Sequence, residues 1–382
     1  MPTVTLAKKL ERALRDGHPW IFRDALRPAP AIPDGTVVEV LARNGRPIAT
    51  GFWDAASPIA VRVLEVGPKA GVEIILRARL EAALALRLAL LDRTRTNAFR
   101  WVHGEADRLP GLHVDLYDEV AVVRFDGGGA RAFYAGIGEE LVRAARPLTL
   151  RGIVDRGGET LFGNTPDRLV VRENGLLFEA DPGHAGKGGL FLDQRENREE
   201  VGRRAKGLSV LNLFGYTGGF SLYAARGGAV STDTVDVSKP ALAAARRNFG
   251  LNGLPLDRAR FHAADAFEFL EAAARRGERW DLVVSDPPSF APSRASLPAA
   301  RRAYTRLHRL AAAVVGCGGT LCAASCSSHF RREDLVASAV EGARATGRRF
   351  VVEAVKGPGV DHPEARWFPE GDYLKFAIGR ME

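Results

Sequence analysis

The sequence predicts an α/β protein whose C-terminal part is a doubly wound sheet of seven strands, with the last strand antiparallel. Three observations support this fold class. From about residue 182, apolar strand-like segments alternate with helical segments, as in βαβ units. The last two strand-like segments, 350–356 and 373–379, are joined only by the loop GPGVDHPEARWFPEGD, which predicts a hairpin. Residues 1–66 carry short alternating strands instead, which predicts a separate barrel-like β module.

The N-terminal module begins with a predicted helix over Leu6–Arg15, which is followed by the run HPWIF at His18–Phe22. The segment GTVVEVLARNGRPIATGFW then alternates apolar and polar residues around an Asn44-Gly45 turn, and ASPIAVRVLEV continues the alternation. Short strands separated by such turns predict a small β domain over residues 1–66.

A second domain, α+β in character, is predicted over residues 67–181. It starts with a long helix at about Val72–Leu91, whose apolar residues recur at helical spacing. Three strands follow (FRWVHGE, GLHVDLY and EVAVVRFD), then a helix at about Ala130–Ala145 and two further strands, LRGIVDRG and RLVVREN.

The third domain, residues 182–382, alternates strands and helices as a doubly wound sheet does. The predicted strands cover residues 208–214, 229–236, 258–264, 280–286, 319–325, 350–356 and 373–379. Helices are predicted between most of them, at 239–249, 266–276, 297–315 and 332–345.

Composition and charge narrow the function. Lys and Arg number 54 and Asp and Glu number 46, so the net charge of +8 favours a polyanionic partner such as RNA or DNA. No apolar run has the length of a membrane span, so no membrane partner is expected. The N-terminus MPTVTLAKKLERALRDG lacks the apolar core of a signal peptide, which predicts a cytoplasmic protein. Whether the protein forms a homodimer stays open.

Cysteine use points away from disulfides and metal. Cys317, Cys322 and Cys326 are the three cysteines, and all lie within ten positions. An odd, clustered set is no disulfide framework, and the absence of a CxxC pair argues against zinc, so no metal is predicted. A buried structural cysteine is the ordinary interpretation for Cys317 and Cys322.

The first strand of the third domain leads into a loop with glycines, NLFGYTGGFSL, at residues 212–222. It contains Phe214 and Tyr216, it is not GxGxxG, and no P-loop lysine follows, which argues against a phosphate site. Asp236 ends the next strand, where a carboxylate can accept both ribose hydroxyls, and Asp265 ends the third, where it can meet an adenine edge. A ribose and adenine site without a pyrophosphate loop indicates S-adenosylmethionine.

The run DPPSF, beginning at Asp286, ends the fourth predicted strand. Pro287 and Pro288 fix the backbone and remove two N–H donors, so their carbonyls and the Asp286 side chain can face a planar base. Ser289 and Phe290 follow, and the phenyl ring can stack on a base taken out of a helix. A plain strand-ending turn is the alternative interpretation.

The run SCSSH, Ser325–His329, ends the fifth strand, which lies beside the fourth in this topology. Cys326 is therefore expected in the same crevice as Asp286. A thiolate is a strong nucleophile, and its addition to carbon 6 of a pyrimidine makes carbon 5 reactive enough to take a methyl group. His329 is either a proton partner of this thiol or a loop histidine.

In these motifs the chain resembles the bacterial 23S ribosomal RNA cytosine-5 methyltransferases that carry an N-terminal PUA domain. The resemblance covers nearly the whole chain and rests on motifs in a constant order. These are HPWIF, EADRLPGLHVDLY (105–117), GGLFLDQRENR (188–198), NLFGYTGGFSL, DPPSF, ASCSSH and the closing DHP…PEGDYLKF from Asp361. The chain departs from the family at Arg108, where glycine is usual, and around Lys187, where glycines replace Gln and Thr.

The resemblance implies roles for individual residues. Cys326 would be the nucleophile, and Asp286 would orient the cytosine. Substrate contacts would come from the residues after Asp286 and from one lysine: Pro287, Pro288, Ser289, Phe290 and Lys187. S-adenosylmethionine would be bound by residues at the strand ends and in the FLD segment: Phe191, Asp193, Asn212, Phe214, Tyr216, Thr217, Gly218, Asp236, Val237, Asp265 and Ala266.

The implied function is methylation of carbon 5 of a cytosine in 23S ribosomal RNA through a covalent cysteine adduct. Two alternatives stay open at this point. DPPSF also resembles the D/N-P-P-F/Y loops of enzymes that methylate exocyclic amines, such as guanine N2, without a thiol. A non-catalytic RNA-binding assembly factor is the other. Asp233, in the polar strand STDTVD, is a rival to Asp236 as the ribose ligand.

Overall fold

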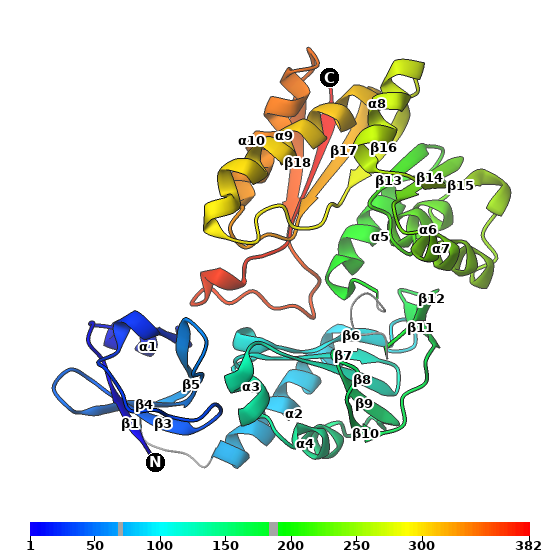
Figure 1. Ribbon diagram of the computed structural model, residues 1–382. Coiled ribbons are helices and arrows are strands. Elements are labelled where there is room, and N and C mark those ends of the chain that lie inside the picture. Colours follow the sequence, from blue (N-terminus) through cyan, green and yellow to red (C-terminus); the bar gives the residue numbers. More distant parts are fainter. Residues whose placement is uncertain (68–71, 183–189) are drawn as a thin grey trace. The chain divides into compact units, whose positions relative to one another are not determined.

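The computed structural model describes residues 1–67, 72–182 and 190–382 (Figure 1). These residues fall into two compact units. Unit 1 comprises the described residues of Met1–Val171, Ala180–Gly189 and Val360–Gly371, and unit 2 those of Arg172–Glu179, Leu190–Gly359 and Asp372–Glu382. The predicted domain boundaries at residues 66 and 181 stay predictions.

The N-terminal part of unit 1 is a five-stranded sheet with the order β1-β3-β4-β5-β2. The strands are β1 (Thr3–Thr5), β2 (Trp20–Phe22), β3 (Val37–Leu41), β4 (Pro47–Trp53) and β5 (Ile59–Val66). The helix α1 covers only Glu11–Arg15. Leu6, at which the predicted helix began, is fully buried and forms a β-bridge with Leu26 instead. Pairing with the barrel therefore outweighs local helix propensity at this position.

The second part of unit 1 is a mixed sheet with the order β10-β9-β8-β7-β6. Its strands are β6 (Ala98–His103), β7 (Leu112–Tyr117), β8 (Val120–Phe125), β9 (Gly152–Asp155) and β10 (Thr160–Gly163), and its helices are α2 (Val72–Leu90), α3 (Gly128–Phe133) and α4 (Ile137–Ala144). The single helix predicted at about Ala130–Ala145 is two helices, because Gly136 adopts a φ of 79°, outside the helical region. A two-stranded hairpin, β11 (Leu169–Glu173) and β12 (Leu176–Ala180), follows.

The segment that connects the last two strands of the chain returns to unit 1. Within this unit, Asp361 accepts a hydrogen bond from the Arg100 backbone N–H at 2.8 Å, and its carbonyl accepts one from Arg87 at 2.8 Å. The fully buried Arg87 also forms a two-bond ion pair with Asp107, at 2.6 and 2.8 Å. Farther along, the ring of Phe368 lies 4.6 Å from that of Trp20. Buried charge pairing thus fixes this connection to unit 1.

Unit 2 contains the predicted seven-stranded doubly wound sheet, in the order β15-β14-β13-β16-β17-β19-β18. Its strands are β13 (Ser209–Leu213), β14 (Ser231–Asp236), β15 (Ala259–Ala263), β16 (Trp280–Ser285), β17 (Val315–Ser325), β18 (Phe350–Lys356) and β19 (Lys375–Met381). The last strand, β19, is antiparallel to both of its neighbours, as the hairpin predicted. Strand order reverses between β13 and β16, which is where doubly wound sheets bind ligands.

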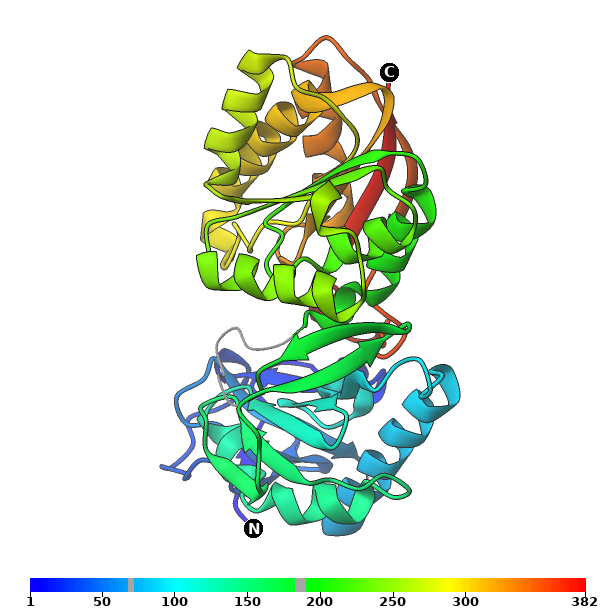
Figure 2. The ribbon, with the colours of Figure 1, turned by 90° about the vertical axis from the view of Figure 1, so that its right-hand side faces the viewer.

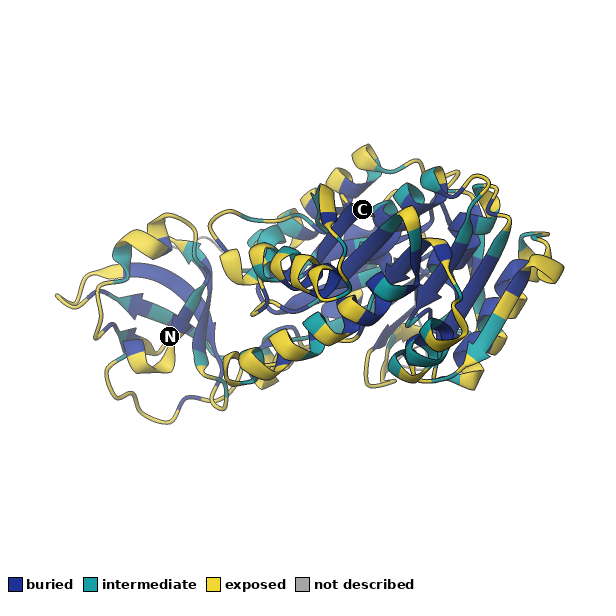
Figure 3. Ribbon diagram, turned by 90° about the horizontal axis from the view of Figure 1, so that it is seen from above, coloured by how far each residue is buried: buried dark blue, intermediate teal, exposed yellow. Residues whose placement is uncertain are grey.

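Helices cover both faces of this sheet (Figure 2). The helices are α5 (Arg195–Arg204), α6 (Gly219–Arg226), α7 (Lys239–Leu251), α8 (Ala266–Arg276), α9 (Leu297–Val314) and α10 (Arg332–Arg344). One apolar core packs α8, α9 and α10 on the sheet, and another packs α5 and α6 on its opposite face. Cys322 belongs to the second core and is fully buried, as expected of a structural cysteine. Cys317 is exposed, so the expectation of burial is wrong for this residue, which lies near the start of β17. Figure 3 shows strand interiors buried and outer helix faces exposed. No helix in the described part of the chain is long and apolar enough to cross a membrane.

Replacement of Arg87 by Met should destabilise unit 1 by about 3 kcal/mol, because it leaves the buried Asp107 carboxylate without its ion-pair partner. The matched control is Arg77→Met on the same helix, which breaks an exposed ion pair with Glu140 and should cost about 1 kcal/mol or less. Calorimetric unfolding of the full-length protein measures both variants. Equal losses in the two variants would show that the buried network does not hold this segment.

Candidate active site

The loop between β13 and α6 has a strained backbone. Phe214 and Tyr216 adopt positive φ angles of 56° and 47°, which are unfavourable for residues with a side chain. Gly218 has a φ of 82°, and a Cβ added there would lie 2.9 Å from the Cβ of Ala245. The Thr217 carbonyl accepts a hydrogen bond from the side chain of Asn248 at 3.1 Å. The surrounding structure therefore holds the loop in a conformation of the kind that concentrates at binding sites.

Asn212 lies beneath this loop and supports its backbone conformation. Its Nδ2 donates to Ser221 Oγ at 3.0 Å, and a Cβ added to Gly215 would lie 2.9 Å from the same nitrogen. Among the described residues, its buried Oδ1 has no hydrogen-bond partner. The amide is thus placed to support the loop from below.

Two carboxylates stand at the ends of the next two strands, as predicted. Asp236 lies next to the loop. Its two oxygens accept hydrogen bonds from the backbone N–H groups of Tyr216 at 2.9 Å and Ser238 at 2.8 Å. Asp265 is exposed and caps α8, whose first residue, Ala266, is buried. Val237 is 71% exposed beside Asp236. Doubly wound sheets bind ligands at such strand ends.

Asp233 is not available for such a role. Its carboxylate is buried and is engaged by Arg260 at 2.6 and 2.7 Å, by His262 at 2.7 Å and by Trp280 at 2.9 Å. These contacts lower the pKa of Asp233 to about 2 against the effect of burial. Asp236 is therefore the acidic residue that this strand offers to a ligand.

Asp286 follows β16 in a largely buried position. Its Oδ2 accepts a hydrogen bond from Gln194 Nε2 at 2.9 Å. Burial, and then the negative charge of Asp193, raise the pKa of Asp286 to about 7, although Gln194 and Arg198 oppose this. The carboxyl group can therefore donate or accept a proton near neutral pH, which is the range a general acid or base needs.

Cys326 lies one residue beyond the end of β17. Strands β16 and β17 are parallel neighbours, with Ser285 opposite Ala323, so both strand ends open at one edge of the sheet. The thiol is partly buried, and burial followed by the charges of Asp286 and Asp193 raises its pKa to about 11, while Lys375 opposes the increase. In the free protein at neutral pH, the sulfur is thus held mainly as a thiol.

Hydrogen bonds join the two loops that carry Asp286 and Cys326. Ser289 and Ser327 bond through their hydroxyl groups, and Ser327 Oγ also donates to the Ala291 carbonyl at 3.2 Å. Pro287 is buried and Pro288 is exposed. Phe290 is partly buried, and its ring lies 4.8 Å from that of Tyr304. The phenyl group therefore packs against α9 as well as forming part of the loop.

The FLD segment reaches the same region. Phe191 is 60% exposed, and its ring lies 5.3 Å from that of Tyr216, edge to face. Asp193 accepts a hydrogen bond from the Tyr373 hydroxyl group at 2.8 Å. Lys187, a predicted substrate contact, lies outside the described residues.

Sequence reasoning missed several groups that shape this site. The buried Arg198 forms a two-bond ion pair with Glu173, at 2.6 and 2.9 Å, and a Cβ added to Gly219 would lie 2.8 Å from Arg198 Cδ. Gln194 and Arg198 belong to the run FLDQRENR, which is one of the motifs in the sequence, but no role was predicted for these two residues.

His329 is exposed in the turn before α10.

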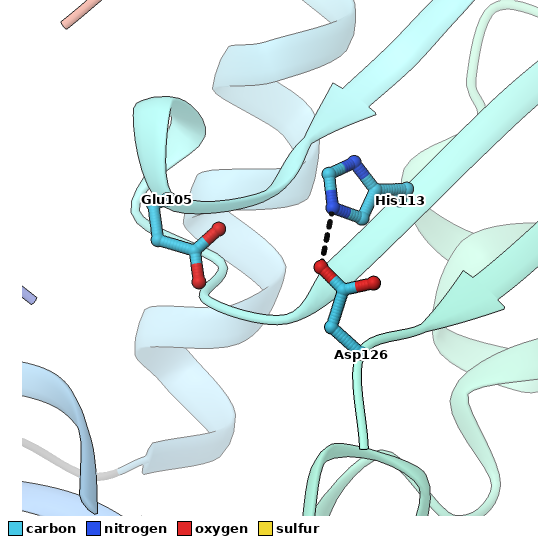
Figure 4. A group of neighbouring side chains, drawn as sticks. All are labelled: Glu105, His113 and Asp126. Atoms are coloured by element: carbon cyan, nitrogen blue, oxygen red, sulfur yellow. Dashed lines mark hydrogen bonds and ion pairs between the residues drawn. The ribbon is translucent and has the colours of Figure 1, made fainter. Parts of the chain in front are cut away.

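A separate group in unit 1, formed by Glu105, His113 and Asp126, has donor atoms close enough to hold a metal ion (Figure 4). Its charges are already compensated. Glu105 accepts a hydrogen bond from Arg62 at 2.7 Å, and His113 lies 3.1 Å from an Arg100 nitrogen and 3.0 Å from Asp126. A cation would meet these two guanidinium groups, so we interpret the group as an ion-pair network.

A strained loop on a seven-stranded sheet, a carboxylate at the second strand end, and an acid beside a thiol define a class of protein, the nucleoside-binding methyltransferases of doubly wound fold. Comparison with known proteins is specific. Residues 128–365 match the S-adenosylmethionine-dependent methyltransferase family, and residues 4–65 match a PUA-like domain. The chain belongs to this S-adenosylmethionine-dependent methyltransferase family.

Curated relatives match over almost the whole chain. A protein of Tolumonas auensis named ribosomal RNA large subunit methyltransferase I is 35% identical, with 99% of each chain covered. A ribosomal RNA large subunit methyltransferase of Deinococcus radiodurans is 37% identical, with 99% of this chain and 97% of the relative covered.

Solved structures share the fold. A candidate methyltransferase of Streptococcus mutans superimposes with a TM-score of 0.85 at 22% identity, with each chain fully covered. A candidate methyltransferase, SMU.776, solved as a complex with SAH, gives 0.86 at 22% identity and the same coverage. The chain thus has the class I methyltransferase fold with an N-terminal PUA-like domain, and its cofactor is S-adenosylmethionine.

Replacement of Asp286 by Asn should remove a pH-dependent decrease in the free energy of unfolding. The pKa of this carboxyl is raised to about 7 in the folded protein, so the folded state binds the proton more tightly than the unfolded state does. The contribution of Asp286 to the free energy of unfolding should therefore fall as pH rises from about 4 to 7, by at most about 4 kcal/mol, and partial exposure of the group reduces this.

The melting temperature of Asp286→Asn relative to the wild type should increase between pH 4 and pH 8, whereas that of the exposed control Asp257→Asn should not. Thermal unfolding across this pH range measures both differences. A constant difference for Asp286→Asn would show that the folded protein does not raise the pKa of this carboxyl.

Proposed function

We propose that this protein transfers a methyl group to carbon 5 of a cytosine in 23S ribosomal RNA, through a covalent adduct with Cys326. The observation that carries the proposal is the placement of the Cys326 thiol and the Asp286 carboxyl at the ends of adjacent parallel strands, in two loops joined through Ser289 and Ser327. The names of the curated relatives support ribosomal RNA of the large subunit as the substrate.

The substrate is held mainly by sequence-independent contacts. The PUA-like domain and the net charge of +8 suit binding to the phosphate backbone of RNA. The target cytosine leaves its stack and enters the crevice, as it must for chemistry on its ring. Phe290 and the carbonyls of Pro287 and Pro288 would contact it.

Asp286 and Cys326 then act together on the base. The protonated Asp286 carboxyl gives its proton to N3 as the sulfur bonds to carbon 6, and the thiol proton passes to the carboxylate left behind. This exchange conserves charge and turns carbon 5 into an enamine-like nucleophile. A pKa of about 7 for Asp286 allows both its protonation states at neutral pH.

S-adenosylmethionine supplies the electrophilic methyl group that the activated carbon 5 accepts. Asp236 would hold its ribose, Asp265 and Ala266 its adenine, and the loop from Phe214 to Gly218 its remaining edge. After methylation, the carbon 5 proton passes to solvent and the bond between sulfur and carbon 6 breaks. The protonated Asp286 carboxyl gives its proton to the departing sulfur and takes back the one on N3, which releases 5-methylcytosine and restores the thiol.

A second candidate function is methylation of an exocyclic amine, such as guanine N2. The raised pKa of Cys326, about 11, favours it, because a protonated sulfur is a weak nucleophile and this chemistry needs no thiol. The DPPSF loop would then act alone. Mass analysis of methylated nucleosides distinguishes the two products.

Whether the protein acts as a homodimer, and in the cytoplasm, stays a prediction.

Replacement of Cys326 by Ala should reduce methyl transfer at least 10³-fold, because the base can no longer be activated covalently. Calorimetry should show unchanged S-adenosylmethionine binding, since no predicted cofactor contact is altered. Cys317→Ala is the matched control, because this cysteine is exposed on β17 away from the strand end.

Full activity of Cys326→Ala would eliminate the covalent route, and a methylated guanine product would establish the second candidate. A wild-type protein that binds RNA and does not bind S-adenosylmethionine would instead be a non-catalytic assembly factor.

A further inference from the structure

Gln194 is the only glutamine in the sequence, and the fold buries it in unit 2. It is the last residue of the short 3₁₀ helix η3 (Leu192–Gln194), directly before α5. The carbonyl of its neighbour Asp193 accepts a hydrogen bond from the Gly359 N–H at 2.9 Å, which holds this turn to the loop after β18. A buried amide needs partners at both of its ends, so the partners of Gln194 define what it does.

Both ends of this amide are used. Its Nε2 donates to Asp286 Oδ2 at 2.9 Å, and its Oε1 accepts from Asn197 Nδ2 at 2.7 Å. The Asn197 nitrogen also donates to the Gly357 carbonyl at 3.2 Å, so both of its N–H groups have partners. The buried Asn197 Oδ1 has no partner in the described part of the chain, so the nitrogen alone sets how this amide is turned.

The order of these bonds fixes their direction. A backbone carbonyl such as that of Gly357 can only accept, so the Asn197 nitrogen faces it. The second N–H of Asn197 then donates to Gln194 Oε1, which turns the Nε2 of Gln194 toward Asp286. Gln194 can therefore only donate to this carboxyl group, in either protonation state of Asp286.

This direction decides where the proton of Asp286 lies. The carbonyl oxygen of a carboxylic acid accepts a hydrogen bond better than its hydroxyl oxygen does, so Oδ2 is the carbonyl oxygen and Oδ1 carries the proton. Asp286 is not fully buried, and its Oδ1 has no hydrogen-bond partner among the residues that the structure describes. The O–H group is thus available to a ligand at the strand ends.

We propose that Gln194 is a positioning residue that fixes the acid proton of Asp286 on Oδ1, and so presents a hydrogen-bond donor to the N3 acceptor of a cytosine. This inference rests on the proposed function, in which Asp286 protonates N3. The proton moves from Oδ1 to N3, while Gln194 keeps both of its amide protons and no bond to it forms or breaks. In uracil N3 carries a hydrogen and cannot accept, so the protonated Asp286 disfavours that base.

The environment of Asp286 shows what Gln194 adds. The ionisable groups that interact with this carboxyl come from several elements: Asp193 on η3, Arg198 on α5, Cys326 after β17 and Tyr304 on α9. Burial, and then Asp193, raise the pKa of Asp286 to about 7, whereas donation from Gln194 and the charge of Arg198 lower it. Since Gln194 is uncharged, its replacement changes this pKa without a change in net charge.

The first test observes Gln194 directly. Because the chain has one glutamine, full-length protein labelled with ¹⁵N in the glutamine side-chain amide gives a single pair of amide proton signals in an NMR spectrum. The proton that bonds to Asp286 should change its chemical shift with pH, with a midpoint of about 7, and this titration should disappear in Asp286→Asn. A signal that does not respond between about pH 5 and pH 9, or that titrates equally in Asp286→Asn, would overturn the proposal.

The second test uses Gln194→Leu, which removes the donor at similar volume. The pKa of Asp286 should rise by about one unit, because the ionised carboxyl loses a hydrogen bond. The melting-temperature difference caused by Asp286→Asn should therefore level off about one pH unit higher in this background than in the wild type. Methyl transfer should fall about tenfold, with unchanged S-adenosylmethionine binding.

Asn252→Leu is the matched control in unit 2. The Asn252 amide, directly after α7, bonds to the carbonyl and N–H of Leu177 at 2.7 and 2.8 Å and is not part of the Gln194 network. The pH at which the Asp286→Asn difference levels off, and methyl transfer, should stay as in the wild type. An equal shift in both variants would show that general loosening, and not the missing donor, moves the pKa, which overturns the role of Gln194.

Neither measurement on Asp286 needs RNA or turnover, so both are independent of the proposed function. An unchanged pH dependence in folded Gln194→Leu overturns the role of Gln194, even where Cys326→Ala is inactive. If Gln194→Leu does not fold, the NMR titration of the wild type and of Asp286→Asn decides alone. Full activity of Cys326→Ala overturns the proposed function instead.

Discussion

The parallel pairing of β16 with β17 is the constraint on which the site depends. Because Ser285 lies opposite Ala323, the chain leaves both strands at the same edge of the sheet, and Asp286 and Cys326 follow the two strand ends there. The crossover helix α9 between the two strands packs into the apolar core, which fixes that register, since a shift by one residue would move Cys322 from the core with α5 and α6 to the opposite face of the sheet. Hydrogen bonds of Ser327 then lock the two loops together.

The electrostatics of the site follow from this geometry. Two carboxylates and a thiol share a poorly hydrated crevice, so burial and mutual repulsion raise the pKa of Asp286 to about 7 and that of Cys326 to about 11. Arg198, which opposes the increase in the pKa of Asp286, comes from α5, an element remote in the sequence. In the proposed reaction, the sulfur would stay protonated until a bound base changes the balance of charge.

The alternating sheet was predicted well because each of its elements has a strong local pattern. Helix α8 and strand β18, for example, have the predicted bounds. It failed where tertiary context decides, as at Leu6, which pairs with Leu26, and at Gly136, which divides one predicted helix into two. At Arg108, which replaces a glycine usual in the family, the chain keeps a φ of 60°, the conformation that glycine favours. The site motifs were visible as short runs, but the role of Arg198 follows only from its buried ion pair with Glu173, which no local pattern reveals.

The central claim is that the Cys326 sulfur bonds to carbon 6 of the target cytosine. Incubation of the protein and S-adenosylmethionine with RNA that contains 5-fluorocytosine tests this most directly, because fluorine at carbon 5 cannot be lost as a proton and the adduct cannot resolve. Protease digestion and mass analysis should then find the methylated nucleotide attached to the peptide that contains Cys326. Recovery of that peptide unmodified, with methyl groups incorporated into the RNA, would contradict the account.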